Sequence, residues 1–216
     1  IQQVQAEKYE EAIASCNQIL TKWEPNGKGR KMFGPVFGHW YYLRGLSQMG
    51  LKQWDPAGES FEKCYDLTND NIVTPDGNPV NWQPNQFRMH SLAQWGNIRM
   101  FVEDYAKARD LYRKALKEDK GNRLPIRQRI YIAVNLGRCL IKAGDVEEGY
   151  NYIVGVLDHE KASSQLKNTV FAILADDWSP KVSRAETLKF LDQYRHIPNS
   201  DTLEDRVNRN HKFHYL

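Results

Sequence analysis

One pattern of packing residues recurs four times along the chain and constrains the fold more than any other feature. In each copy a bulky residue is followed by a small residue at the third position after it, by a medium or large residue at the seventh, and by another packing residue at the tenth. The copies start at Tyr9, Trp54, Tyr105 and Val146. Spacings of three and four place these side chains on one face of an α-helix. The sequence therefore predicts a repeated amphipathic helix.

A glycine precedes the bulky residue by nine positions in three of the copies. These glycines are Gly45, Gly96 and Gly137. Where two helices of a hairpin cross closely, a side chain would hold their backbones apart, so glycine permits the approach. We interpret each glycine as the crossing point of a helical hairpin, with a small residue such as Ala108 on the facing helix. The clearest hairpin spans residues 86–118.

These residues resemble the tetratricopeptide repeat (TPR) family, whose helix-turn-helix unit has a Leu-Gly pair in its first helix and small and aromatic residues in its second. Leu136 and Gly137 match that pair directly, and Trp95-Gly96 and Arg44-Gly45 match it more loosely. The family repeats about every 34 residues. The copies here are 45, 51 and 41 residues apart, so we assign the excess to inter-repeat loops. The resemblance implies an all-α fold, a right-handed α-α superhelix or TPR-like solenoid of about four to five helix pairs.

We predict a single TPR-like helical repeat domain over residues 1–216. Its repeats are expected at about 1–23, 37–68, 86–119 and 126–160, with a divergent capping pair at 163–196 and a tail at 197–216. The first pair is expected to be incomplete, because Tyr9 already starts a second helix. Since the chain begins at Ile1 without an initiator Met, we expect a fragment or a processed product.

Two connecting stretches and two helix starts complete the predicted organisation. Residues 24–38 and 69–85 are rich in Gly and Pro and are predicted to be loops between repeats. Trp82 in the second stretch either pins that loop to the solenoid or is displayed to a partner. In the capping pair, Ser163 or Ser164 is expected to cap one helix, and Pro180 to lie in the first turn of the next.

The chain carries no recognisable motif for catalysis, a cofactor or a metal ion. A net charge of +3 with interleaved acidic and basic residues gives no reason to expect nucleic acid, and no apolar run is long enough to span a membrane. His211 and His214 are interpreted as a solvated pair, and Asp176 and Asp177 as helix-end or solvated carboxylates. The three cysteines fall on helix packing positions, where we expect buried thiols: Cys16, Cys64 and Cys139. We therefore predict neither an enzyme nor a cofactor, and the sequence assigns no compartment.

The resemblance implies a protein- or peptide-binding scaffold, because the first helices of such a solenoid line a concave groove. Positions expected to face the groove are His39, Tyr42, Leu46, Met49, His90, Ala93, Asn97, Met100, Tyr131, Val134, Arg138 and Ile141. Co-chaperone members of the family clamp a peptide carboxylate from successive first helices. Asn97 and Arg138 occupy such places, although Ala93 and Val134 stand where a lysine would be expected.

Two other readings of the chain stay open at this point. The first is a self-assembly or intramolecular scaffold segment of a larger protein, with self-association through the open first repeat. The second, and least favoured, is an enzyme. For Arg138 the structural alternative is an ion pair with a carboxylate of the neighbouring hairpin, such as Asp110 or Glu103.

Overall fold

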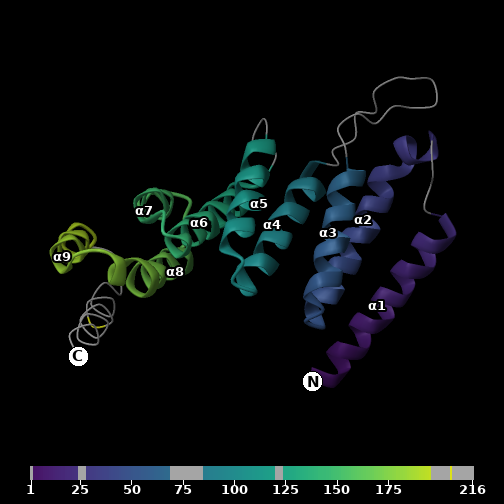
Figure 1. Ribbon diagram of the computed structural model, residues 1–216, viewed down its shortest axis with the longest axis horizontal. Helices are drawn as coiled ribbons and strands as arrows, with labels where there is room; N and C mark the ends of the chain where they lie inside the picture. Colours follow the sequence, from purple (N-terminus) through teal and green to yellow (C-terminus); the bar gives the residue numbers. More distant parts are fainter. Residues whose placement is uncertain (1, 24–27, 69–84, 120–123, 196–204, 206–216) are drawn as a thin grey trace. The chain divides into compact units, whose positions relative to one another are not determined.

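The computed structural model describes residues 2–23, 28–68, 85–119, 124–195 and 205, and the structural statements below concern these residues. Within them every regular element is helical (Figure 1). They divide into two compact units, residues 1–124 and residues 125–216, which we treat separately. The predicted loop around Trp82 and the predicted tail with His211 and His214 lie outside the described ranges.

Unit 1 contains helices that pack against their neighbours in chain order. Its elements are α1 (Gln2–Trp23), α2 (Lys28–Gly50), α3 (Trp54–Leu67), α4 (Asn85–Phe101) and α5 (Tyr105–Glu118). Short turns join α2 to α3 and α4 to α5, and Lys52 and Glu103 adopt positive φ angles of 59° and 62° in them. The Asp104 side chain then accepts a hydrogen bond from the Lys107 amide (3.2 Å) and caps the start of α5.

Each hairpin of unit 1 closes where a glycine meets an aromatic ring. A Cβ atom on Gly45 would lie 2.8 Å from Cε1 of Phe61, and one on Gly96 would lie 2.8 Å from Cε1 of Tyr112. Both rings are fully buried, as is Ala108 on α5. These contacts confirm that the repeated glycines mark close helix crossings, because a side chain there would displace the ring.

Unit 2 begins with a hairpin of the same kind and ends with shorter elements. It contains α6 (Ile126–Ala143), α7 (Val146–Val154), α8 (Ser164–Ile173), a π-helical turn η1 (Leu174–Trp178), a 3₁₀ turn η2 (Ser179–Lys181) and α9 (Arg184–Gln193). Gly144 ends α6 with a left-handed φ of 103°, a conformation that favours glycine. A Cβ on Gly137 would lie 2.5 Å from Cγ1 of Ile153 and 2.7 Å from the Gly149 carbonyl oxygen.

Two residues were predicted to mark the helix starts of the last pair, and the structure agrees for Ser163 but not for Pro180. Ser163 caps α8, since its hydroxyl accepts a hydrogen bond from the Leu166 amide (3.2 Å). Pro180 lies in η2 instead of opening α9. Ser183 caps α9 in a capping box with Glu186, in which each residue's side chain bonds the other's backbone amide.

The first pair also differs from its prediction. α1 is one continuous helix, so Tyr9 lies within it instead of starting a second helix. Tyr9 does pack on the next hairpin, because a Cβ on Gly50 would lie 2.5 Å from its ring. α2 begins at Lys28 and not near Phe37, so the loop predicted at 24–38 is helical from Lys28 onward. Glycine and proline content is a weak guide to a helix that is held by packing on both sides.

The structure also bears on the cysteines and on membrane-spanning helices. Cys16, Cys64 and Cys139 are buried free thiols, as predicted. In the ranges that the structure covers, no helix has the length and apolar content that crossing a bilayer requires.

Candidate functional site

Aromatic and imidazole side chains gather where α2 and α4 face each other in unit 1. The His39 ring centroid lies 4.6 Å from that of Phe87 and meets it edge-on. The Tyr42 ring lies 5.6 Å from Phe87 and 6.2 Å from His90. A spacing of three along each helix explains why these four half-buried residues form two facing stripes. We call His39, Tyr42, Phe87 and His90 the α2–α4 face.

Three of these four residues were predicted to face a groove, and Phe87 was missed. It lies three positions before His90, the spacing that could have revealed it. His39 Nδ1 is buried and has no hydrogen-bond partner within the described ranges. Leaving a buried polar atom unpaired costs about 1–3 kcal/mol. The face is therefore a mainly aromatic surface with one unsatisfied polar atom.

Tyr42 supplies a neutral polar group beside these rings. Burial raises the pKa of its phenol, and a hydrogen bond from Gln94 offsets part of that effect. The phenol therefore keeps its proton at neutral pH and is available as a hydrogen-bond donor.

The other residues predicted along the groove in unit 1 take part in packing. Leu46 and Met49 are half-buried against the core formed by Ala57, Phe61 and Ile98. Met100 is half-buried and Ala93 is buried. The Asn97 amide donates to Gln94 Oε1 (2.9 Å) and accepts from the Tyr112 hydroxyl (2.5 Å). Asn97 thus holds the ring that covers Gly96.

Of the residues predicted to line the groove in unit 2, some are exposed and others are buried in the core. Tyr131 is 49% exposed, whereas Val134 and Ile141 are 1% and 0% exposed. Ile141 is buried because it packs against Gly149, where a Cβ would lie 2.7 Å from the Ile141 side chain. Val134 and Ile141 therefore belong to the core of unit 2 and offer no surface to a ligand.

Arg138 lies on the surface of unit 2 but holds a buried carboxylate. Its Nε donates to Asp177 Oδ2 (2.8 Å), and Lys142 Nζ lies 2.5 Å from Asp177 Oδ1. The π-helical turn η1 carries Asp177, whose side chain is 4% exposed. The interpretation of Asp177 as a solvated carboxylate is wrong, because two cations one helical turn apart compensate its burial. The partner of Arg138 is this aspartate, in place of the proposed Asp110 or Glu103.

Comparisons with known proteins bear on the fold. No protein-family model matches the chain, and no curated protein matches it either. Among solved structures, one similar chain is a variant of a candidate kinesin light chain from Podosopora anserina with nearly identical TPR-like repeats. The two share 16% sequence identity with a TM-score of 0.63, over 93% of this chain and 91% of that chain. This chain has a TPR-like repeat fold. The predicted fold class is thereby confirmed, and folds of this type commonly mediate protein-protein interaction.

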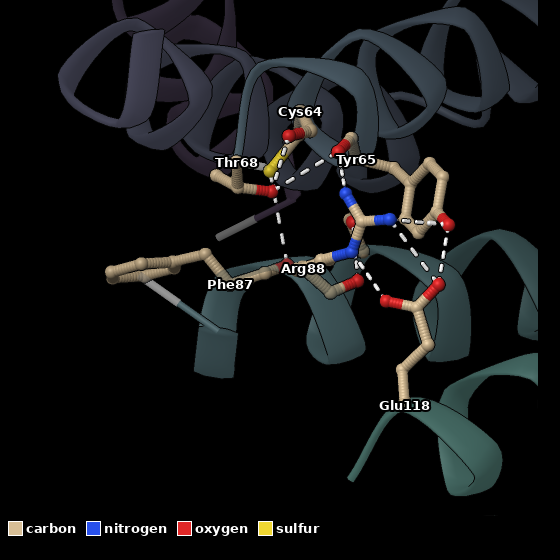
Figure 2. A network of polar contacts seen from close by, with 7 residues as sticks. Cys64, Tyr65, Thr68, Phe87, Arg88 and Glu118 are labelled. Carbon is tan, nitrogen blue, oxygen red and sulfur yellow. Dashed lines mark hydrogen bonds and ion pairs between the residues drawn. The ribbon is translucent and has the colours of Figure 1, made fainter. Parts of the chain in front are cut away.

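A second polar cluster joins the two TPR-like hairpins of unit 1 (Figure 2). Arg88 of α4 donates to the Tyr65 carbonyl oxygen of α3 (2.9 Å) and forms an ion pair with Glu118 of α5. The guanidinium also lies over the Tyr65 ring, 3.8 Å from its centroid, and the Tyr65 hydroxyl donates to Glu118. Lys114 Nζ lies 4.0 Å from the centroid of the same ring.

The polar groups of this cluster bond one another, so the cluster holds α3, α4 and α5 together. Burial raises the pKa of Glu118, but hydrogen bonds from Arg88 and Tyr65 outweigh burial and keep that pKa below its ordinary value. Burial and the hydrogen bond to Glu118 raise the pKa of Tyr65 to about 12. None of these residues was singled out in the sequence, because a contact between α3, α4 and α5 leaves no short-range pattern.

The structure changes what is expected of Arg138. Replacing it by Ala removes one of two cations from a buried carboxylate, so we expect the free energy of unfolding to fall by about 1–2 kcal/mol. This is less than for a fully buried pair, because Lys142 remains and the Arg138 side chain is 41% exposed. Arg127→Ala is the matched control, since Arg127 is an exposed residue of the same helix, eleven positions before Arg138. Equal urea midpoints for the two variants would mean that Lys142 alone compensates Asp177.

No metal centre is evident among the described residues, since no group of three or more His, Cys, Asp or Glu side chains in them is placed to hold an ion.

Proposed function

We propose that this TPR-like chain is a scaffold that binds a protein or peptide segment on its α2–α4 face. The proposal rests on the half-buried cluster of His39, Tyr42, Phe87 and His90, whose neighbouring rings lie 4.6–6.2 Å apart. Aromatic rings of this kind offer large contact areas at a small cost in conformational entropy. The fold supports the proposal, because it commonly mediates protein-protein interaction.

The chemistry of the face indicates what it would contact. Phe87 and Tyr42 favour an apolar or aromatic side chain of the bound segment. The unpaired Nδ1 of His39 needs a polar partner, which the main chain of an extended peptide supplies once the imidazole turns toward it. Leu46, Met49 and Met100 lie on the same two helices and are only partly buried, so they would add apolar contact.

The carboxylate clamp expected from Asn97 and Arg138 receives less support. Gln94 and Tyr112 already bond the Asn97 amide, and Asp177 is bound to Arg138. A ligand carboxylate would have to compete with these contacts. We therefore propose a contact through apolar and aromatic groups and assign no clamp to these two residues.

A peptide-array screen on the intact chain tests the proposal. The double variant His39→Ala, His90→Ala is expected to bind the selected peptides at least ten times more weakly, a loss of about 1.4 kcal/mol or more. His159→Ala is the matched control, because His159 lies in unit 2 between α7 and α8. Identical binding profiles for all three proteins would exclude the α2–α4 face as the contact surface.

Self-association is the alternative function, and the same protein samples can test it. On α1 the exposed residues include Glu10, Glu11 and Gln18, a polar set that favours contact with water. We therefore expect one sedimentation coefficient across a hundredfold range of protein concentration. A coefficient that rises with concentration and returns to the monomer value in a Tyr9→Glu variant would favour self-assembly through α1.

A further inference from the structure

Unit 2 contains a cavity between α7 and α9 that lies apart from every predicted groove residue. Its volume is about 710 Å³. Small organic molecules bind in cavities of about 300–1,000 Å³ that combine an apolar lining with a few polar groups. The size therefore suits a small molecule held between two helices.

Aromatic side chains form the floor of this cavity. Trp178 stacks on Tyr150 with ring centroids 4.8 Å apart, and Phe190 meets Trp178 edge-on at 5.6 Å. Trp178 and Phe190 are 6% and 3% exposed, since both also belong to the core of unit 2. The floor is thus fixed by packing before any ligand arrives, which lowers the entropy lost on binding.

The rim of the cavity carries two lysines and two glutamates. Lys181 and Lys189 both line it, and within the described ranges neither forms an ion pair. Glu186 lines it too, but its carboxylate accepts hydrogen bonds from the Ser183 amide (2.9 Å) and hydroxyl (2.6 Å). Glu147 stands on the α7 side of the cavity. The formal charges of the four groups therefore balance, but in the described ranges neither ammonium group has an ion-pair partner, whereas one of the two carboxylates already accepts hydrogen bonds.

We propose that this cavity binds an amphipathic organic anion, a small molecule with an apolar or aromatic body and one acidic group. The body packs on Tyr150 and Trp178, and Lys181 and Lys189 attract the anionic group at the rim. This site belongs to unit 2 and is independent of the peptide contact proposed for α2 and α4. Loss of binding at one site would therefore leave binding at the other unchanged.

Fluorescence titration with a pair of dyes tests the charge and the cavity together. The first dye is 1-anilinonaphthalene-8-sulfonate, an aromatic anion, and the second is N-phenyl-1-naphthylamine, which has the same rings and no charge. We expect saturable binding of the anionic dye at one site per chain, at least ten times tighter than the neutral dye. The double variant Lys181→Gln, Lys189→Gln should weaken the anionic dye about tenfold and the neutral dye less than twofold.

Two further variants separate the cavity from general surface binding. Lys117→Gln, Lys161→Gln removes two lysines that do not line the cavity and should leave both affinities unchanged. Asn151→Trp places a large ring in the cavity from α7 and should weaken both dyes tenfold or more. Thermal unfolding of each variant checks that the fold is retained. Equal affinities for the two dyes, or no effect of the Lys181 and Lys189 changes, would overturn the proposal.

Displacement of the bound dye distinguishes a small molecule from a peptide of similar chemistry. Dodecanoate and the peptide acetyl-Leu-Phe-Asp-Glu-amide each combine an apolar body with a carboxylate. Displacement at lower concentration by dodecanoate supports the proposal. Displacement at lower concentration by the peptide overturns it and makes the cavity a second peptide site.

Discussion

Replacing Gly137 by Ala is expected to lower the free energy of unfolding by about 3 kcal/mol, at the upper end of overpacking effects. The added methyl group would lie 2.7 Å from the Gly149 carbonyl oxygen and 2.5 Å from Ile153 Cγ1. A side chain can adopt another rotamer, but a backbone carbonyl moves only if α6 and α7 separate. Urea unfolding followed by circular dichroism measures the change.

Gly155→Ala is the matched control for this substitution. The nearest atom to a Cβ on Gly155 is the Asn151 carbonyl oxygen at 3.8 Å, an ordinary contact. We expect this variant to be unchanged or slightly stabilised, because alanine reduces the freedom of the unfolded chain. Equal midpoints for Gly137→Ala and Gly155→Ala would mean that the α6–α7 crossing is wider than described.

Ala108→Leu should destabilise the protein by about 1–3 kcal/mol, since Ala108 is 0% exposed.

Replacing Arg88 by Ala is expected to destabilise the protein by about 2–3 kcal/mol. The change removes the ion pair with Glu118, the bond to the Tyr65 carbonyl and the contact with the Tyr65 ring, while Glu118 stays half-buried. Breaking a fully buried pair costs about 3–5 kcal/mol, and the 16% and 24% exposure of these side chains reduces that figure. Arg109→Ala is the control, because its carboxylate partner Asp110 is 62% exposed.

The effect of Arg88 should also depend on pH. Its contacts lower the pKa of Glu118 in the folded state, so their stabilisation is complete above the ordinary carboxyl pKa of about 4.3. It is lost as the pH falls through the lowered folded pKa, where Glu118 becomes protonated. The difference in unfolding free energy between wild type and Arg88→Ala should therefore shrink in acid. A difference that is constant from neutral pH to about pH 3 would show that the loss comes from packing and not from the ion pair.

The hairpins could be predicted from the sequence because their contacts are local. Gly45, Gly96 and Gly137 meet residues of the very next helix, so helical periodicity and small residues were enough to pair the helices. His39, Tyr42 and His90 were expected to face a groove from the resemblance to the repeat family, and the structure brings their rings together between α2 and α4. Ile141 was misplaced, because it contacts Gly149 at the crossing itself.

Other features depend on contacts between distant segments and could not be predicted in this way. Asp177 lies in a π-helical turn and is buried beside Arg138, and no residue pattern in the sequence predicts such a turn. The cluster around Arg88 joins three helices that are separated by loops. The cavity of unit 2 arises from the approach of α7 and α9, which are separated in the chain by α8 and two short turns.

The glycine contacts also determine where the chain tolerates insertions and deletions during evolution. Gly45 and Phe61, Gly96 and Tyr112, and Gly137 and Ile153 are each sixteen residues apart, although the spacing between hairpins varies. One residue added between a glycine and its partner would rotate the second helix by about 100° and carry the partner side chain off the glycine. A residue added between hairpins would leave all three contacts in register. Length differences among homologues should therefore accumulate in the segments between hairpins, while the interval of sixteen residues from each glycine to its partner stays constant.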